Sequence, residues 1–340
     1  MDRERPGMKT SRTTLLAAGA GFATLGLLAG VPALLGHRLA PSLAALGGAD
    51  RNWLALAVAG FAAAFACTVG AWRSAFRAAG AQLCPREAAA RLGVGSLVNA
   101  VSPAKLGDAV KVALCARTLE GSGRLWTSGG VYAALAAARS LALAAVVVVA
   151  SAAGALPLWP VFALCGVAAA VGLAAWLSPR LRGHRRISRL LEGVSALARS
   201  PRDATVVIAW TLGVQVARLL AIAAVARGLG LPHPLVAALL IAPALDLAGV
   251  FPLTPGSFGL GGAAVAAALA SRGIGITQAL GVGIGIQALE TLVSIAAGSA
   301  GAAYLARLNP VVRRWTARVA VVGGSAGLAA ALGFLVVALS

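Results

Sequence analysis

The chain has 340 residues, of which 59% are hydrophobic and only 11% are charged, and its mean hydropathy is +0.88. Soluble domains carry about 25% charged residues, and disordered chains are poor in apolar ones, so this composition excludes both classes. The net charge of +19 lies mostly on arginines between apolar stretches, where it attracts anionic lipid headgroups rather than nucleic acid. We therefore predict an all-α polytopic membrane protein.

Apolar stretches long enough for membrane helices recur along the whole chain. A hydrocarbon core of about 30 Å needs roughly 20 apolar residues per helix. Seven stretches reach that length and predict full spans: residues 15–35, 53–72, 132–154, 156–177, 204–226, 279–304 and 319–339. The first is too long for a signal-peptide core and predicts a retained anchor. The shorter stretches 235–251 and 258–270 predict broken or re-entrant helices.

The basic residues orient these spans. They cluster in the N-terminus and in segments 73–124, 179–203 and 305–318, which all fall on one face of the predicted topology. Because basic loops stay in the cytoplasm, we expect a cytoplasmic N-terminus and an outer C-terminus at Ser340, in a bacterial plasma membrane. Segment 179–203 also spaces its apolar residues for one helical stripe. It predicts either an amphipathic helix on the cytoplasmic surface or a plain topology loop.

Two motifs with the pattern [S/T]-P-x-x-[L/F]-G divide the single domain 1–340 into halves, 13–178 and 204–340. They occupy residues 102–107 and 254–259, and each precedes a short apolar stretch. Their conspicuous members are Ser102, Pro103, Lys105 and Gly107 in the first, and Thr254, Pro255, Gly256 and Gly259 in the second. Ser or Thr before Pro is typical of a helix start, so each motif predicts a helix that begins within the membrane.

The two motifs enter the membrane from opposite faces in this topology, because three predicted spans separate them. Interrupted helices at matching places in inverted halves indicate a binding site near the middle of a transporter. There the amide groups at helix N-termini face an anionic group. Such breaks also occur in membrane helices without a functional role. The fold we expect is about seven full transmembrane helices plus two re-entrant elements, arranged as an inverted pseudo-repeat.

These motifs resemble those of a known family. Residues 99–111, Asn-Ala-Val-Ser-Pro-Ala-Lys-Leu-Gly-Asp-Ala-Val-Lys, and residues 252–259, Pro-Leu-Thr-Pro-Gly-Ser-Phe-Gly, are similar to S-P-[AG]-[RK]-x-G-[ED] and P-x-[ST]-P-G-G-x-G. Those patterns belong to flippase-like membrane proteins related to the transmembrane region of lysylphosphatidylglycerol synthase. The resemblance covers residues 15–339. It implies lipid handling; we do not expect lipid lysylation, because no aminoacyl-transferase domain follows the last predicted span.

The chain departs from the family pattern at three places that carry charge. The family usually has Arg-Glu after the second motif, where this chain has Gly261 and Gly262. Of the family's E-R-x-x-D in the third span only Arg139 remains. A family arginine in the seventh long stretch corresponds to Glu290. These differences predict a substrate preference of the chain's own.

Four charged residues, Arg139, Arg218, Asp246 and Glu290, lie inside predicted apolar stretches, where each charge costs at least about 2.5–3.5 kcal/mol in a lone helix. Near the first motif, Lys105, Asp108 and Lys111 add further candidates for a site. Lys105, Lys111, Arg139 and Arg218 would line a lipid-phosphate site, with Asp246 and Glu290 as counter-charges or carriers of a coupling proton. Alternatively, Arg139 or Arg218 pairs with Asp246 or Glu290 to tie helices together. Asp108 and Lys111 lie three residues apart and should pair. Arg139, eight residues into its predicted span, is placed where it can snorkel to the inner surface.

The function predicted from these features is a lipid translocase that moves an anionic or lipid-linked amphiphile between leaflets. The chain has no Walker motif, so we expect no nucleotide hydrolysis. Its scattered cysteines and three histidines predict no metal, cofactor or disulfide framework. An integral membrane enzyme acting on a lipid or polyprenyl-linked substrate, and an accessory subunit, are the alternatives. Partners left open besides membrane lipids are a second copy of the chain and a lipid-biosynthesis enzyme.

Overall fold

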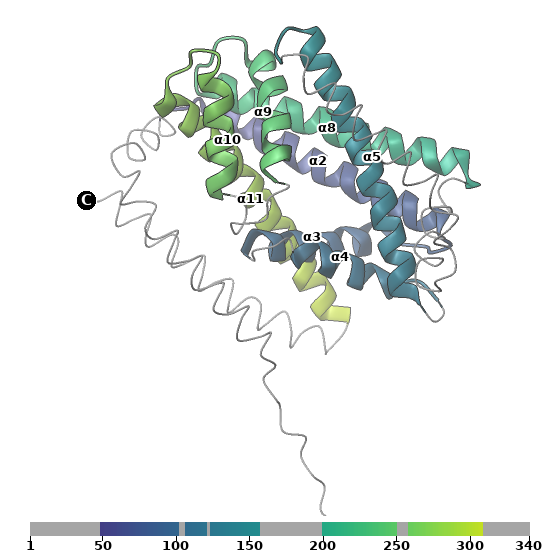
Figure 1. The fold of residues 1–340 in the computed structure, drawn as a ribbon. Coiled ribbons are helices and arrows are strands. Elements are labelled where there is room, and N and C mark those ends of the chain that lie inside the picture. Colours follow the sequence, from purple (N-terminus) through teal and green to yellow (C-terminus); the bar gives the residue numbers. More distant parts are fainter. Residues whose placement is uncertain (1–47, 102–105, 121–122, 157–198, 250–257, 309–340) are drawn as a thin grey trace, which may run out of the picture.

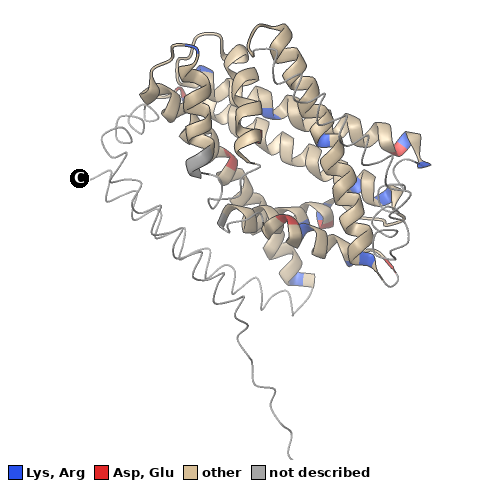
Figure 2. Ribbon diagram, viewed as in Figure 1, with Lys and Arg blue, Asp and Glu red and all other residues tan. Residues whose placement is uncertain are grey.

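The computed structural model describes residues 48–101, 106–120, 123–156, 199–249 and 258–308. These residues form eight α-helices and no strand, so the all-α prediction is confirmed for this part of the chain (Figure 1). Charged positions are sparse along the helices, which are uncharged over most of their length (Figure 2).

Four of the eight helices are long and apolar enough to cross a membrane. They are α2 (Arg51–Ala78), α5 (Arg124–Ala152), α8 (Pro201–Gly228) and α11 (Ile276–Leu308). They contain nearly all of the predicted spans 53–72, 132–154, 204–226 and 279–304, which are therefore confirmed as helices. The predicted spans 15–35, 156–177 and 319–339 and most of segment 179–203 lie outside the described residues, so the count of seven spans stays a prediction.

The start of α5 corrects one expectation. The helix begins at Arg124, eight residues before the predicted start of the span, and it has 29 residues. Arg139 therefore lies near the middle of the helix and not eight residues from its start, and its snorkelling to the inner surface stays a prediction. The sequence did not predict this start, because Thr127 and Ser128 interrupt the apolar residues. Leu125 and Trp126 therefore lie outside the uninterrupted apolar stretch.

Helices α2 and α8 form an antiparallel pair held together by close approaches at small residues. A Cβ atom on Gly60 of α2 would lie 2.9 Å from the Cβ of Ala221, and one on Gly228 would lie 3.1 Å from the Cβ of Trp53. Glycine and alanine at these places let the two backbones approach closely, which is how membrane helices gain van der Waals contact without a hydrophobic driving force. Of the short helices described below, α9 packs on α8 of this pair and α3 contacts α2.

Two pairs of short helices complete the described fold. The first is α3 (Pro85–Val101) with α4 (Leu106–Ala116), and the second is α9 (Pro234–Ala248) with α10 (Phe258–Ala270). The short stretches 235–251 and 258–270 are thus confirmed as short helices. Helix α3 was not predicted from the sequence. It packs on α11, where Gly298 lies against Leu97 so tightly that a Cβ on this glycine would overlap the leucine side chain.

Contacts between elements define two opposite ends of the molecule. At one, which we call the Arg77 end, Arg77 at the end of α2 pairs with Asp203 at the start of α8 (2.7 Å). At the same end Arg73 Nε donates to the carbonyl of Leu83, two residues before α3 begins (3.0 Å). The first pair of short helices is therefore connected to the rest of the fold at the Arg77 end, where α3 begins.

The opposite end, which we call the Arg272 end, collects the other connections. The amide of Asp50, which caps α2, donates to the carbonyl of Gly228 at the end of α8 (3.2 Å). Arg272, which follows α10, donates to the carbonyl of Gly154, which follows α5. Helix α9 begins and α10 ends at this end. The two pairs of short helices therefore enter the fold from opposite ends, α9 and α10 at the top of Figure 1 and α3 and α4 below.

Candidate functional site

A chain of charges joins four helices inside the bundle. Arg218 of α8 holds Asp246 of α9 at 2.5 Å between Nη1 and Oδ1. Its other terminal nitrogen lies 3.7 Å from Oε2 of Glu290 on α11. Arg139 of α5 approaches Oδ1 of Asp246 at 3.6 Å. The structure therefore brings together all four charges that the sequence placed inside predicted spans, and we call them the ionic cluster.

The ionic cluster is buried at its centre and open at its edge. The side chains of Arg218 and Asp246 are 10% and 12% exposed, whereas those of Glu290 and Arg139 are 45% and 61% exposed. A charge-assisted hydrogen bond joins the two buried members, and the 3.6 and 3.7 Å contacts of the open members are longer than hydrogen bonds. The cluster thus has a fixed core pair and two loosely held charges that solvent or a ligand can reach.

The sequence of α8 explains why Arg218 points inward. Thr211, Gln215 and Arg218 recur at helical spacing and are all buried, so they form one polar stripe on an otherwise apolar helix. The Nε atom of Arg218 has no hydrogen-bond partner in the described part of the chain, and neither has Oε1 of Gln287 on α11. Buried polar atoms are almost always paired with protein or water, so these two indicate a place for water or for a polar group of a ligand.

Gln287 occupies the space above Gly261, where the family usually has a charged pair. A Cβ on Gly261 would overlap the side-chain amide of Gln287, and one on Gly283 would lie 3.0 Å from Cα of Gly262. The glycines therefore let α10 pack closely on α11. A side chain at position 261 does not fit here without displacing Gln287, whereas a Cβ on Gly262 would meet nothing within 4 Å.

A second polar cluster lies at the tip of the first pair of short helices. Asp108, in the first turn of α4, accepts hydrogen bonds from Asn99 of α3 (2.9 Å), Lys111 of α4 (3.0 Å) and Tyr132 of α5 (3.0 Å). The predicted Asp108–Lys111 pair is confirmed. The carboxylate joins three helices, and Lys111 is 16% exposed beside it, so its charge is largely balanced within the protein.

Gly107 of the first motif allows this arrangement. Its Cα lies against α3 so closely that a Cβ would overlap the carbonyl oxygen of Gly95 and the side-chain oxygen of Asn99. A Cβ on Gly95 would in turn overlap the stem of Lys111. The two glycines place the start of α4 directly on α3, which brings Asp108 within reach of its partners.

The structure places only some of the predicted site residues. Gly107, Asp108, Lys111, Arg139, Arg218, Asp246 and Glu290 are described, and Gly259 is the second residue of α10. Ser102, Pro103, Lys105, Thr254, Pro255 and Gly256 lie outside the described residues, so their role stays a prediction. Sequence reasoning missed Asn99, Tyr132 and Gln287. A polar side chain in an apolar stretch was the available signal for Gln287 and Asn99; nothing local pointed to Tyr132.

Four long apolar helices and the short pairs between them define the class of the protein as a multi-pass membrane protein. The sequence profile of the family described as "Lysylphosphatidylglycerol synthase TM region" matches residues 14–298, which include both polar clusters and both pairs of short helices. The chain therefore belongs to this family of lipid-related membrane proteins. No curated protein matches the chain at a significant level.

Proposed function

We propose that the protein moves lipids with an anionic headgroup between the two leaflets of the membrane, without hydrolysing a nucleotide and without changing the lipid covalently. The observation that carries the proposal is the ionic cluster, in which two arginines and two acids from four helices meet inside an apolar bundle. Charges within a membrane are costly and mark pathways for substrates or ions. Membership of a lipid-related family makes a lipid headgroup the natural polar ligand.

The geometry supports a division of roles within the ionic cluster. Asp246 holds Arg218 by a short hydrogen bond, whereas Glu290 stands 3.7 Å away and is nearly half exposed. A headgroup phosphate would therefore displace Glu290 rather than Asp246. The phosphate would also gain a contact with Arg139. The side chain of Arg139 is 61% exposed, and its ion-pair partner Asp246 lies 3.6 Å away. In the absence of lipid the cluster is electrically neutral, and an anionic headgroup restores that balance when Glu290 is displaced or protonated.

The two pairs of short helices support a path that both leaflets can reach. They enter from the Arg77 end and from the Arg272 end, and Asp246 lies near the inner tip of the second pair, two residues before α9 ends. We interpret them as the inverted pseudo-repeat of a transporter, with the N-termini of α4 and α10 directed toward the middle of the membrane. In the orientation we propose, the Arg77 end and the N-terminus face the cytoplasm of a bacterium and the C-terminus is outside.

Reconstituted protein tests the proposal. Vesicles of phosphatidylcholine would carry a trace of either phosphatidylglycerol or phosphatidylcholine labelled with NBD on a short acyl chain, which leaves the headgroup intact. Dithionite destroys label only in the outer leaflet, so protein that moves lipid exposes the label of the inner leaflet. We expect faster loss of protected phosphatidylglycerol than in protein-free vesicles, and a rate about tenfold lower in Arg139→Gln, because a charge-assisted contact is worth about 1.5–3 kcal/mol.

Matched variants separate the role of Arg139 from a general loss of charge. Arg124→Gln removes an exposed arginine from the start of the same helix and should leave the rate unchanged. Glu290→Gln removes the competitor for the phosphate and should raise the preference for phosphatidylglycerol over phosphatidylcholine. Protection that matches protein-free vesicles for both lipids, with protein shown to be inserted and folded, would refute translocation.

A further inference from the structure

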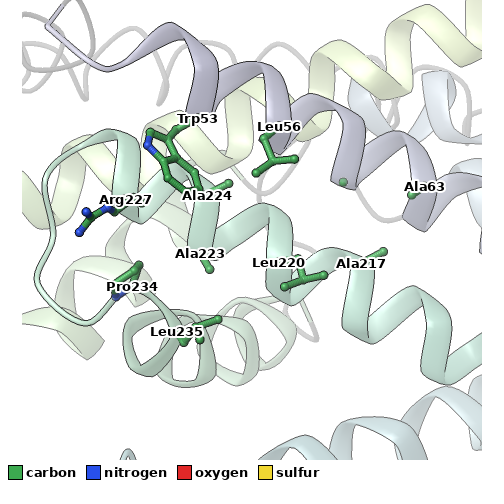
Figure 3. Close-up of a pocket in the computed structure, with 11 residues that line it drawn as sticks. Trp53, Leu56, Ala63, Ala217, Leu220, Ala223, Ala224, Arg227, Pro234 and Leu235 are labelled. Atoms are coloured by element: carbon green, nitrogen blue, oxygen red, sulfur yellow. The ribbon is translucent and has the colours of Figure 1, made fainter.

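A groove on the outside of the bundle lies between α2, α8 and the start of α9. Its volume is about 460 Å³, and its walls are apolar except for Arg227. Figure 3 shows Trp53 and Arg227 at one end, with Leu56 and Leu220 further along the helices. The volume falls within the range of about 300–1,000 Å³ that is typical of ligand sites.

This groove is separate from the ionic cluster. Its wall on α8 consists of Ala217, Leu220, Ala224 and Arg227 with their neighbours, which recur at helical spacing along one face. Arg218 and its polar stripe lie on the opposite face, because successive residues of a helix are rotated by about 100°. What occupies the groove therefore does not occupy the ionic cluster.

The length and position of the groove match one leaflet. From Ala217 to Arg227 the helix rises about 15 Å, which is about half of a hydrocarbon core of about 30 Å. Arg227 and Trp53 lie at the Arg272 end, and tryptophan and arginine are typical of the membrane interface. The groove thus runs from the interface to the middle of the bilayer, as an acyl chain of that leaflet does.

The charges at the mouth select the headgroup. Arg227 is exposed and takes part in none of the ion pairs formed within the described residues. Arg51, also exposed, lies at the same end, because the amide of Asp50 contacts the carbonyl of Gly228. The carboxylate of Asp50 accepts the amide of Asn52 as a helix cap. The Asp50 carboxylate keeps its charge when it accepts this hydrogen bond, but among the described residues Arg227 and Arg51 still leave the mouth with a net positive charge. A cationic mouth beside an apolar groove is complementary to a phosphate joined to a hydrophobic tail.

We propose that this groove binds one phospholipid with a net negative headgroup from the leaflet at the Arg272 end. One acyl chain lies in the groove that α2, α8 and the start of α9 line, and the headgroup phosphate contacts Arg227. This lipid is a bound companion of the fold and not the lipid in transit, so the proposal requires only that the protein spans a membrane. Its failure would leave the proposed function intact, and the reverse also holds.

Native mass spectrometry of the full-length protein with added phosphatidylglycerol or phosphatidylcholine tests this assignment. We expect one phosphatidylglycerol molecule to be retained more strongly than the rest. Its apparent affinity should fall about tenfold in Arg227→Gln, since one charge-assisted contact is lost. In Ala63→Phe, which fills the groove, the retained molecule should be lost. The controls are Arg272→Gln, at the same end, and Ala62→Phe, at an exposed position of α2 outside the groove; both should retain it.

A second measurement keeps the test independent of folding defects in these variants. Phosphatidylglycerol brominated close to the glycerol should quench the wild-type fluorescence more than that of Trp53→Phe, because Trp53 lines the groove. Equal retention in all variants, or equal retention of phosphatidylcholine, would overturn the proposal. A photo-reactive probe attached to a cysteine at position 56 that cross-links to segment 15–35 or to a second copy of the chain would also overturn it, because a protein segment would then occupy the groove.

Discussion

Arg218 is a buried charge that the surrounding helices must balance. It is buried in an apolar bundle, and its charge is balanced by Asp246 in direct contact and by Glu290 at longer range. A buried pair gains little over apolar residues of the same size, but removal of one partner leaves an uncompensated charge. The interaction therefore constrains where α8 and α9 meet, and the stability of the bundle depends on both partners being present.

Replacement of Asp246 by Asn tests this dependence. We expect the free energy of unfolding to fall by about 3–5 kcal/mol, because Arg218 then keeps only the distant Glu290. The double change Arg218→Met with Asp246→Leu should lose less than the single change, since neither charge remains in the core. Glu290→Gln should cost about 0–1 kcal/mol, as exposed ion pairs do. Denaturant unfolding in detergent micelles measures all three. A double variant less stable than Asp246→Asn would contradict this account.

Gly107 allows a second test at the scale of one atom. A Cβ here meets the carbonyl oxygen of Gly95, which belongs to the backbone and cannot rotate away. Gly107→Ala should therefore destabilise the protein by about 1–3 kcal/mol, the usual cost of overpacking. Gly129→Ala is the matched control, because its Cβ would meet nothing within 4 Å and alanine favours a helix by about 0.5–1 kcal/mol. Equal effects on the unfolding midpoint would contradict the close approach.

At the scale of helices, sequence reasoning succeeded where the signal was local. The long helices follow from apolar length alone, and the Asp108–Lys111 pair follows from a spacing of three residues. Helix α3 escaped prediction because Arg86, Glu87 and Arg91 interrupt its apolar pattern, and its place depends on tertiary contact with α11. The partner of Asp246 was left open between two arginines for the same reason: spacing along one helix says nothing about which helices meet.

The pairing of α2 with α8 is a long-range contact that one cysteine can test. A Cβ on Gly213 would lie 3.8 Å from the Cβ of Cys67, which is close to the mean separation in disulfides of about 3.8 Å. Gly213→Cys should therefore form a disulfide with Cys67 under mild oxidation. Loss of both thiols to maleimide modification, in a background with the other cysteines changed to serine, reports the bond. Gly129→Cys should stay reduced, and a reactive pair at 67 and 213 would argue against this packing.

At the scale of the molecule, the two ends differ in how they are built. At the Arg77 end an ion pair joins α2 to α8. At the Arg272 end the contacts are hydrogen bonds to backbone carbonyls, from Asp50 to Gly228 and from Arg272 to Gly154. Positive charge retained on the cytoplasmic side orients membrane proteins. Many arginines of the basic segment 73–124 lie in elements at the Arg77 end, so the described fold and the charge distribution support one orientation.

Thiol labelling in intact cells tests that orientation with a native residue as the internal reference. Cys84 is exposed and lies in the connection between α2 and α3, at the Arg77 end. Arg272→Cys would place a second thiol at the opposite end. In a variant with the remaining cysteines replaced by serine, a membrane-impermeant maleimide should modify position 272 in intact cells and Cys84 only after permeabilisation. The reverse pattern would invert the proposed topology and, with it, move the groove at Arg227 to the cytoplasmic leaflet. Modification of both thiols in intact cells, with the membrane shown to be sealed, would mean that the two ends do not lie on opposite sides of the membrane, and the arrangement of the short helix pairs as an inverted repeat would then fail with the topology.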